Sequence, residues 1–521
     1  MSLTFRVDGR AVEVADDGAS LLEVLRERLG IRSPKDGCSP QGQCGCCTVL
    51  VDGQPRVACV TPARRVAGRG VTTLDGLAEA ERSAWADAFL ASGASQCGFC
   101  TPGIIVRLSA LRATGRGNEK DVDNALLAHL CRCTGWVTIK EAFARVAGPQ
   151  PPSAPAPRDR AAAAQRAALE GGALQQVGTH VALGAAGFAD DTAPLDALVA
   201  VPDGAGGWAV AETLSEARAR AGKAQGRRST IGLRHPLEMP PGPWDAALRT
   251  AWVEPAYLEP DASWCRPGGQ PASPVANGGA FGGKAASVAP AAARRLADEY
   301  RRAVRVLLSR EDVVRLGPKR PPVAGGIRRD GSGVLRVVRT PGVAEAVNGV
   351  APGLVVEEVD VAGPPTSCAV RAAGWAEAAV LLAAARDEAT ATVTAPSGAR
   401  AEAEVGADGS VRVRVACGDP LDEVVLRSYC VGAAHMAMGW VRSEGIAVDD
   451  EGVAHDLTIR SFGVLRAQDM PAVQVEIEGV AGPPVNGSDA VFAAVAAAVW
   501  RAEGHARDWP TCRGRGGGRG R

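Results

Sequence analysis

Nine of the fourteen cysteines in this 521-residue chain lie between Cys38 and Cys133. Cysteines at this density form either a disulfide framework, in a small secreted chain, or a metal site in a reducing compartment. The start of the chain has no apolar signal-peptide core and no twin arginine, and no later stretch approaches the roughly 18 apolar residues that a membrane span needs. We therefore expect a cytoplasmic protein without a membrane partner, whose cysteines ligate metal.

The first set of cysteines has the spacing of an iron–sulfur loop. Cys38 is followed by Cys44, Cys46 and Cys47, and Cys59 comes twelve residues after Cys47. Plant-type [2Fe-2S] proteins use C-x4-C-x2-C and a distant fourth cysteine, and this loop is longer by one residue. The pattern predicts Cys38, Cys44, Cys47 and Cys59 as ligands; the alternatives are Cys46 in place of Cys47, or a zinc site. The glycines that suit such a tight loop are Gly37, Gly42 and Gly45.

The second set consists of two pairs, Cys97 with Cys100 and Cys131 with Cys133. Pro102 favours a helix that begins directly after the first pair, and the free N–H groups at its start would then face the metal site. A C-x2-C pair alone indicates little, but together with C-x1-C and the upstream set it predicts a second [2Fe-2S] cluster held by these four thiolates.

Apolar spacing and composition divide the chain into several units, as its length also suggests. Residues 3–7 and 11–14 are predicted strands around a turn, and 78–147 has helical periodicity. After a proline-rich stretch, β-favouring and Ala-rich helical segments alternate, which predicts a mixed α/β region. The predicted divisions are a first domain at 1–76, a helical domain at 77–148, a linker at 149–175, a mixed region at 176–511 and a basic Gly/Arg tail at 512–521. With 58 basic and 58 acidic residues, the balance gives no indication of a nucleic-acid partner.

Residues 1–148 resemble the iron–sulfur subunit or domain of the xanthine oxidase and aldehyde oxidoreductase family, the molybdenum hydroxylases. The motifs that carry the resemblance are Gln43-Cys-Gly-Cys-Cys-Thr-Val49, Gln96-Cys-Gly-Phe-Cys-Thr-Pro-Gly103 and Leu130-Cys-Arg-Cys-Thr-Gly135. The resemblance implies a multidomain α+β protein, with a ferredoxin-like β-grasp domain for an outer cluster and a four-helix domain for an inner one. It also implies that Gln96 and Cys133 lie beside a molybdopterin, and that electrons pass from molybdenum through the inner and outer clusters to a flavin or another acceptor.

The region after residue 175 resembles an abridged molybdopterin-binding domain. Asn277-Gly-Gly-Ala-Phe-Gly-Gly-Lys284 is similar to the family's molybdenum-site loop, which makes Gly279, Phe281 and Gly282 candidate cofactor contacts. Leu308-Ser-Arg-Glu-Asp312 matches a strand-end motif, and Arg371 corresponds to the family's transition-state arginine. Several pterin-binding stretches of the family have no counterpart, so molybdopterin binding in this chain is doubtful.

The family's general base is missing from its expected place. The Val-Gly-Glu-Pro-Pro motif of the family, whose glutamate activates the metal-bound hydroxyl, is Val480-Ala-Gly-Pro-Pro484 here, with Gly482 at the glutamate position. Loss of a general base costs about 10²- to 10⁴-fold in rate. Glu476, Glu478 and Asp489 are nearby acidic residues, and without its partner Arg371 is expected to be structural. His435 is expected to be a buried, hydrogen-bonded histidine, and the five later cysteines to be ordinary small residues.

Three functions follow from this pattern. The first is an electron-transfer subunit that docks on a separate molybdopterin-binding catalytic subunit. The second is a complete single-chain hydroxylase acting on an aldehyde or N-heterocycle, and the third is a non-catalytic assembly or scaffold partner. The missing glutamate and the absent stretches favour the first. No dinucleotide-binding Gly-x-Gly-x-x-Gly motif follows a convincing strand, so FAD is expected on another, FAD-binding subunit.

Overall fold

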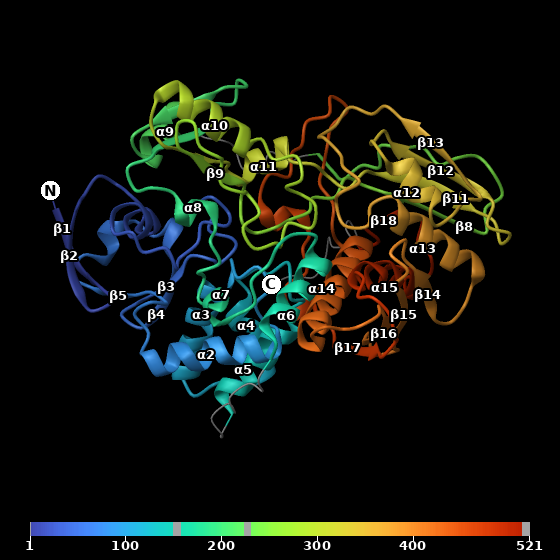
Figure 1. The fold of residues 1–521 in the computed structure, drawn as a ribbon, viewed down its shortest axis with the longest axis horizontal. Coiled ribbons are helices and arrows are strands. Elements are labelled where there is room, and N and C mark those ends of the chain that lie inside the picture. The colour runs from blue at the N-terminus through green and yellow to red at the C-terminus, as the bar shows by residue number, and fades with distance from the viewer. Residues whose placement is uncertain (1, 149–157, 223–230, 513–521) are drawn as a thin grey trace.

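The described residues form four β-sheets and a group of helices, and three of these sheets lie after residue 158. In the computed structural model the described residues are 2–148, 158–222 and 231–512. Figure 1 shows the N-terminal sheet at one end of the molecule, helices α2 to α5 next to it, and the C-terminal sheets at the other end. The predicted multidomain α+β fold is therefore confirmed. The predicted proline run at 149–157 and the Gly/Arg tail after residue 512 lie outside the described residues.

The N-terminal unit is a five-stranded mixed sheet in the order β2-β1-β5-β3-β4. Strands β1 and β2 pair as the predicted hairpin, and Asp8 and Gly9 at its turn both have positive φ, as a two-residue hairpin turn requires. The chain between 21 and 28 is helical, with Leu21 and Leu25 buried under the sheet. The strands are β1 (Ser2–Val7), β2 (Arg10–Ala15), β3 (Thr48–Val51), β4 (Gln54–Val57) and β5 (Gly70–Thr72). The helical segments are α1 (Leu21–Glu23), η1 (Val24–Arg28), η2 (Ala58–Val60) and η3 (Ala63–Val66).

The next unit is helical, as the periodicity predicts. Its helices are α2 (Glu79–Ser92), α3 (Thr101–Ala113), α4 (Glu119–Leu126) and α5 (Val137–Ala147). Trp85 on α2 packs against Phe89 and Phe143, with ring centroids 6.3 and 6.1 Å away. Pro102 occupies the first turn of α3, which confirms that this helix begins directly after Cys100. Within the described ranges, no helix combines the length and apolar character needed to cross a membrane.

The remaining chain is mixed α/β, with strands and Ala-rich helices that alternate as the composition predicts. One sheet contains β6 (Leu198–Pro202), β7 (Trp208–Ala211), β9 (Ala262–Cys265) and β10 (Val304–Leu307). A second contains β8 (Ala246–Thr250), β11 (Val323–Ile327), β12 (Gly333–Val338), β13 (Leu354–Val359) and β18 (Asp508–Trp509). The third contains β14 (Ala391–Thr394), β15 (Arg400–Val405), β16 (Val411–Ala416) and β17 (Val473–Glu478).

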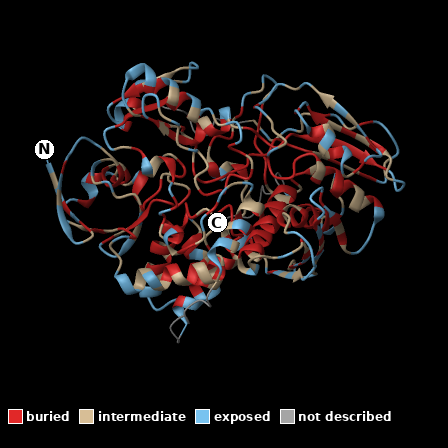
Figure 2. Cartoon of the chain, in the orientation of Figure 1, coloured by how far each residue is buried: buried red, intermediate tan, exposed pale blue. Residues whose placement is uncertain are grey.

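Helices cover and connect these three sheets. They are α6 (Arg160–Gly171), α7 (Thr179–Ala182), α8 (Ala189–Thr192), α9 (Leu214–Ala221), α10 (Ala289–Tyr300), α11 (Arg310–Leu316), α12 (Val343–Asn348), α13 (Trp375–Arg386), α14 (Glu423–Arg442) and α15 (Ser488–Ala502), with short turns η4 (Ile459–Phe462) and η5 (Ala467–Asp469). Figure 2 shows α14 and α15 buried along most of their length. A single buried cluster runs from Phe5 through Trp85 and Leu248 to Trp440, whereas the sheet of β6, β7, β9 and β10 packs with α9 and α10 in separate clusters.

Helix α14 lies directly on the loop that contains Cys131 and Cys133. A Cβ atom at Gly432 would lie 1.8 Å from the Cys133 carbonyl oxygen, and one at Gly135 would lie 2.7 Å from the Val431 carbonyl oxygen. Both glycines therefore allow two backbones to touch. The sequence gives no warning of this contact, because the two segments are about 300 residues apart.

Buried ion pairs add charge contacts to this packing. Arg132, between Cys131 and Cys133, makes a bidentate pair with Glu444, with Nη2 2.7 Å from Oε2, and its Nε donates to the Pro255 carbonyl. Both side chains are almost fully buried, at 3% and 2% exposure. Removing one member of such a pair leaves the other charge buried and uncompensated.

We predict that Arg132→Met lowers the free energy of unfolding by about 3–5 kcal/mol, because Glu444 remains buried without its partner. Denaturant titration followed by tryptophan fluorescence measures the change. The control is Arg339→Met, which breaks an exposed pair with Asp360 and is expected to cost less than about 1 kcal/mol. Equal losses in the two variants would contradict the prediction.

A second prediction concerns Glu259, whose carboxylate lies 2.7 Å from the ammonium of Lys284. Burial raises the pKa of Glu259 to about 7 from 4.5, because desolvation outweighs the attraction of Lys284. The carboxyl group therefore favours the folded state while it is protonated, and this stability is lost as the pH rises from about 4.5 through 7. Glu259→Gln should flatten that part of the stability–pH curve, whereas Glu357→Gln, at an exposed pair, should leave it unchanged. Unfolding measured at successive pH values tests this, and an unchanged slope in Glu259→Gln would refute it.

Candidate functional site

The first group of cysteines gathers in one buried place. Cys38, Cys44 and Cys47 come from the loop before β3, and Cys59 comes from the turn η2 after β4. Hydrogen bonds from Cys44 and Cys59 lower the pKa of the Cys38 thiol far below its ordinary value. The backbone N–H of Gln41 lies 3.2 Å from the Cys38 sulfur, and that of Cys59 lies 3.4 Å from the Cys47 sulfur. The site therefore offers four thiols with backbone donors directed at two of them.

Cys46 lies between the two groups of thiols. Its side chain is fully buried, and the pKa of its thiol is raised above the ordinary value. A hydrogen bond with Cys44 lowers this pKa, but burial and the nearby Cys38, Cys47 and Cys97 together raise it by more. Its neighbours therefore include thiols of both groups.

The second group combines the two predicted pairs. The sulfurs of Cys97 and Cys133 are 3.7 Å apart, and a hydrogen bond from Cys100 lowers the pKa of Cys131. Cys97 and Cys100 precede α3, while Cys131 and Cys133 lie between α4 and α5. Of these eight thiols, Cys97 is partly exposed and the other seven are buried.

The loops of the two groups are in direct contact. A Cβ at Gly103, in the first turn of α3, would lie 2.4 Å from the Gly45 carbonyl oxygen. His129 joins them from the side: its Nε2 is 3.0 Å from the Thr48 hydroxyl, and burial lowers its pKa to about 3, so that it is neutral. Sequence reasoning missed His129, although it stands only two residues before Cys131.

Each group contains four thiols. A [2Fe-2S] cluster distributes four thiolates over two irons, so each group provides the number of ligands that one such cluster needs.

The glycine loop at 277–284 packs against the second cysteine group. A Cβ at Gly279 would lie 2.7 Å from the Cys97 Cβ, and one at Gly282 would lie 1.6 Å from the Ala369 carbonyl oxygen. Both glycines have positive φ, so each position requires glycine for its backbone as well as for space. The Arg371 N–H donates to the Phe281 carbonyl at 3.0 Å, which joins the loop to the Arg371 segment.

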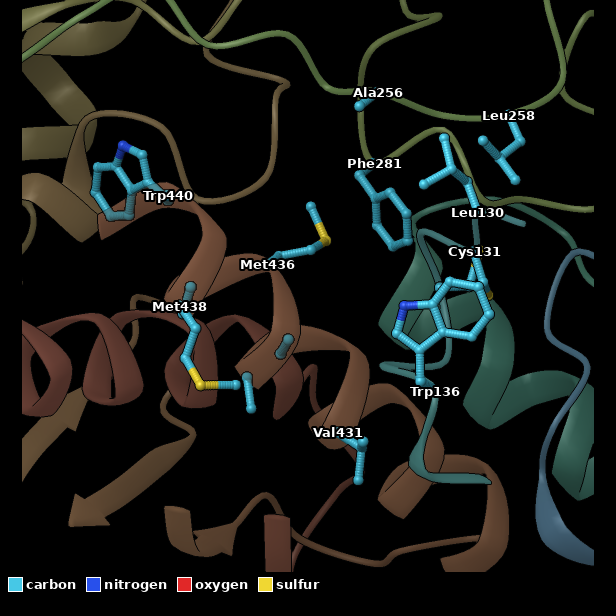
Figure 3. Packing of buried hydrophobic residues seen from close by; sticks show 14 of the residues in the cluster. Leu130, Cys131, Trp136, Ala256, Leu258, Phe281, Val431, Met436, Met438 and Trp440 are labelled. Carbon is cyan, nitrogen blue, oxygen red and sulfur yellow. The ribbon is translucent and has the colours of Figure 1, made fainter. Parts of the chain in front are cut away.

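Arg371 is 5% exposed, and other parts of the chain engage its guanidinium. Its Nε donates to Asp489 at 2.9 Å, Nη1 lies 3.3 Å from the Met436 sulfur, and the other end contacts Ser488. Figure 3 shows Phe281 and Met436 facing each other across the space between the glycine loop and α14. Asp489, one of the acidic residues near Gly482 in the sequence, is therefore an ion-pair partner of Arg371.

Gln96 is also engaged by side chains and backbone of this chain. Its Nε2 donates to the Cys133 carbonyl and to the Ser428 hydroxyl on α14, both at 2.9 Å. The backbone carbonyl of Gln96 accepts a hydrogen bond from the Asn277 side chain. The cavity beside it, lined also by Gln175 and Tyr429, has a volume of about 20 Å³. Cofactor pockets are usually about 300–1,000 Å³, so this cavity is far too small for one.

The remaining predicted residues have ordinary surroundings. Gly482 is exposed, with φ 146° and no atom within 4 Å of a Cβ placed there. Glu476 and Glu478 lie on β17 and pair with Arg414 at 3.3 Å. His435 is buried and its Nε2 is 3.0 Å from the Leu465 carbonyl, as predicted.

Comparison with known proteins agrees with this geometry. Residues 5–69 match the model of a 2Fe-2S iron-sulfur cluster binding domain, and residues 73–144 match that of a [2Fe-2S] binding domain. The xanthine dehydrogenase iron-sulfur-binding subunit of Escherichia coli is 42% identical over 126 residues, which are 23% of this chain and 78% of that protein. The nicotinate dehydrogenase small FeS subunit of Eubacterium barkeri is 37% identical over 144 residues, which are 27% of this chain and 90% of that protein.

The whole chain also has the fold of solved structures. The aldehyde oxidoreductase from Desulfovibrio gigas superposes with a TM-score of 0.72 at 14% sequence identity, over 98% of this chain and 99% of that one. An aldehyde oxidoreductase from Desulfovibrio desulfuricans gives a TM-score of 0.70 at 15% identity, over 98% and 99%. At this identity the likeness concerns the fold alone. Taken with the two matched cluster-binding domains, the sequence relatives show that the chain belongs to the xanthine dehydrogenase and aldehyde oxidoreductase family, the molybdenum hydroxylases.

Proposed function

We propose that this chain is the electron-transfer iron–sulfur component of a molybdenum-hydroxylase-type dehydrogenase. It takes electrons from a molybdopterin centre on a partner protein and passes them through two [2Fe-2S] clusters to FAD or another acceptor. The observation that carries this proposal is the pair of four-thiol groups whose loops touch at Gly45 and Gly103. Relatives that are named as subunits, both the xanthine dehydrogenase and the nicotinate dehydrogenase ones, support partner chains.

The eight thiols divide between the clusters by their positions. Cys38, Cys44, Cys47 and Cys59 hold the outer cluster, and Cys97, Cys100, Cys131 and Cys133 hold the inner one. The clusters supply reversible one-electron storage when bound. The chain itself excludes water from the sulfurs by burial and directs backbone N–H groups at them, as with Gln41 and Cys38. Cys46 is a bystander in the small-residue position of the loop.

We infer the points of electron entry and exit from the exposure of each group. Cys97 is the partly exposed thiol of the inner group, so the molybdopterin-binding partner approaches there. On the outer group, Val60 is 57% exposed, follows Cys59 and lies 2.9 Å from a Cβ placed at Gly42. An acceptor such as an FAD-binding subunit can reach the outer cluster over this apolar side chain.

The residues of this chain do not fit a molybdopterin. The expected contacts Gln96, Gly279, Phe281 and Gly282 are packed against other parts of the same chain, and the cavity beside Gln96 holds about 20 Å³. Arg371, the expected catalytic residue, is paired with Asp489, and no carboxylate occupies position 482. These contacts favour electron transfer over the alternative of a single-chain hydroxylase, whose support is the retained glycine loop and the full-length likeness in fold.

Metal analysis tests the proposal directly. Protein purified anaerobically should contain about four irons per chain, from two clusters of two irons, and no stoichiometric molybdenum. The molybdenum and flavin should appear only in the complex that co-purifies with it. Stoichiometric molybdenum in the isolated chain would establish the single-chain hydroxylase instead, and clusters that cannot be reduced would leave the scaffold function.

Cysteine variants test the ligand assignment. Cys59→Ala should remove the outer cluster and its EPR signal, because one of its four thiolate ligands is lost. The inner signal should remain, because a separate group of thiolates holds the inner cluster. Cys46→Ala is the matched control in the same loop and should retain both signals and all the iron. Loss of iron in Cys46→Ala, or its retention in Cys59→Ala, would overturn the assignment.

A further inference from the structure

Arg310 at the start of α11 points into the protein behind the outer group of thiols. Its side chain is fully buried, with 0% exposure. Its position follows from the local sequence, because Ser309 caps the helix and Asp312 completes a capping box with it. The cap fixes the first turn and directs the neighbouring arginine inward.

The guanidinium reaches the backbone of the outer cysteine loop. Its Nη2 donates to the Gly37 carbonyl at 2.8 Å and to the Leu258 carbonyl at 2.9 Å. Gly37 in turn lies against the sulfurs, since a Cβ placed on it would be 3.1 Å from the sulfurs of both Cys44 and Cys46. One glycine residue therefore separates this cation from the thiols.

The positive charge of Arg310 has no carboxylate partner among the described residues. Its Nε and Nη1 atoms make no hydrogen bond, and Nη2 bonds only to backbone carbonyls. The ring of Tyr257, 5.7 Å from the guanidinium carbon, supplies a weak cation–π contact. A fully buried cation is costly unless a negative charge compensates it.

Other buried cations in the same part of the molecule do have acidic partners. These pairs are Arg26 with Asp190, Lys35 with Asp191, Arg132 with Glu444, and Arg305 with Asp190. The charge of each is balanced locally, and its field at the sulfurs is reduced accordingly. Arg460 also lies near Cys38 and Cys44, but it is exposed, so water and salt screen it.

We propose that Arg310 is the counter-charge of the outer cluster and raises the reduction potential of that cluster above the value it would have in the N-terminal unit alone. The inference rests on the proposed function, since it requires the outer thiols to hold a [2Fe-2S] cluster. A cluster bound by four thiolates is anionic, and accepting one electron from the inner cluster makes it more negative by one charge. The buried guanidinium stabilises that reduced form, which favours electron flow from the inner cluster to the outer one.

The position of Arg310 gives the C-terminal region a role of its own. Arg310 belongs to the mixed α/β region, while the thiols belong to the N-terminal sheet. The region after the linker therefore positions a residue that adjusts the potential of the outer cluster, in addition to providing packing. Arg310 is a positioning residue: it does not ligate the cluster, but acts on it through its contact with Gly37 and through its charge.

The test is an EPR-monitored redox titration of the full-length protein with both clusters bound. Arg310→Gln removes the charge but keeps an N–H donor, and the reduction equilibrium constant of the outer cluster should fall at least tenfold, which is 59 mV for one electron. The inner cluster should be unaffected. The matched control is Arg315→Gln, which removes an exposed arginine from the same helix and should shift neither potential.

Arg310→Lys separates the effect of charge on the outer potential from the effect of side-chain shape, because the charge of the lysine can be changed by pH in one variant. A lysine buried without a carboxylate partner loses its proton more readily, so the outer potential should approach the wild-type value near pH 6 and the Arg310→Gln value near pH 9. The wild-type protein, measured over the same pH range, is the control for other titrating groups. This variant also decides the matter if Arg310→Gln does not assemble the outer cluster.

The outcomes distinguish the two proposals. Two reducible clusters with unchanged outer potentials in Arg310→Gln, or a pH-independent shift in Arg310→Lys, overturn the role of Arg310 and leave the electron-transfer function standing. Absence of both [2Fe-2S] signals from the wild-type protein overturns the proposed function itself. A selective fall in the outer potential, absent from Arg315→Gln, supports the inference.

Discussion

Burying eight thiols in two adjoining groups is the constraint on which the rest of this structure depends. Glycines meet at the contact between the two loops, because any side chain on Gly103 would collide with the Gly45 carbonyl. The neutral His129 fills the space next to them without adding charge. Helices α3 and α5, the N-terminal sheet and the long helix α14 all pack around this contact, and one hydrophobic core encloses them.

Helix α14 contacts the residues at which the resemblance implies a pterin. The resemblance places a pterin beside Gln96 and Cys133, whereas here Ser428 bonds to Gln96 and Gly432 touches the Cys133 backbone. In this chain that surface of the helical unit packs against α14. The glycines of the loop pack on Cys97 and Ala369.

Local features of the sequence predicted local structure well. The turn at Asp8 and Gly9 and the helix that begins after Cys100 each depend on neighbouring residues, and each occurs as expected. Contacts between distant segments were not predictable in this way. The pairing of Arg371 with Asp489 and the approach of α14 to Cys133 join residues more than 100 positions apart, and neither leaves a periodic or spacing signal.

The partial exposure of Cys97 affects the sensitivity of the protein to oxidation in air. A thiolate that an electron donor can approach is also open to dioxygen and peroxide, and oxidation of cysteine follows thiolate character and exposure. The seven other thiols are shielded by the fold, but the shield over Cys97 is incomplete. Under the proposed function, durability of the inner cluster under oxidising conditions therefore depends on a partner that covers Cys97.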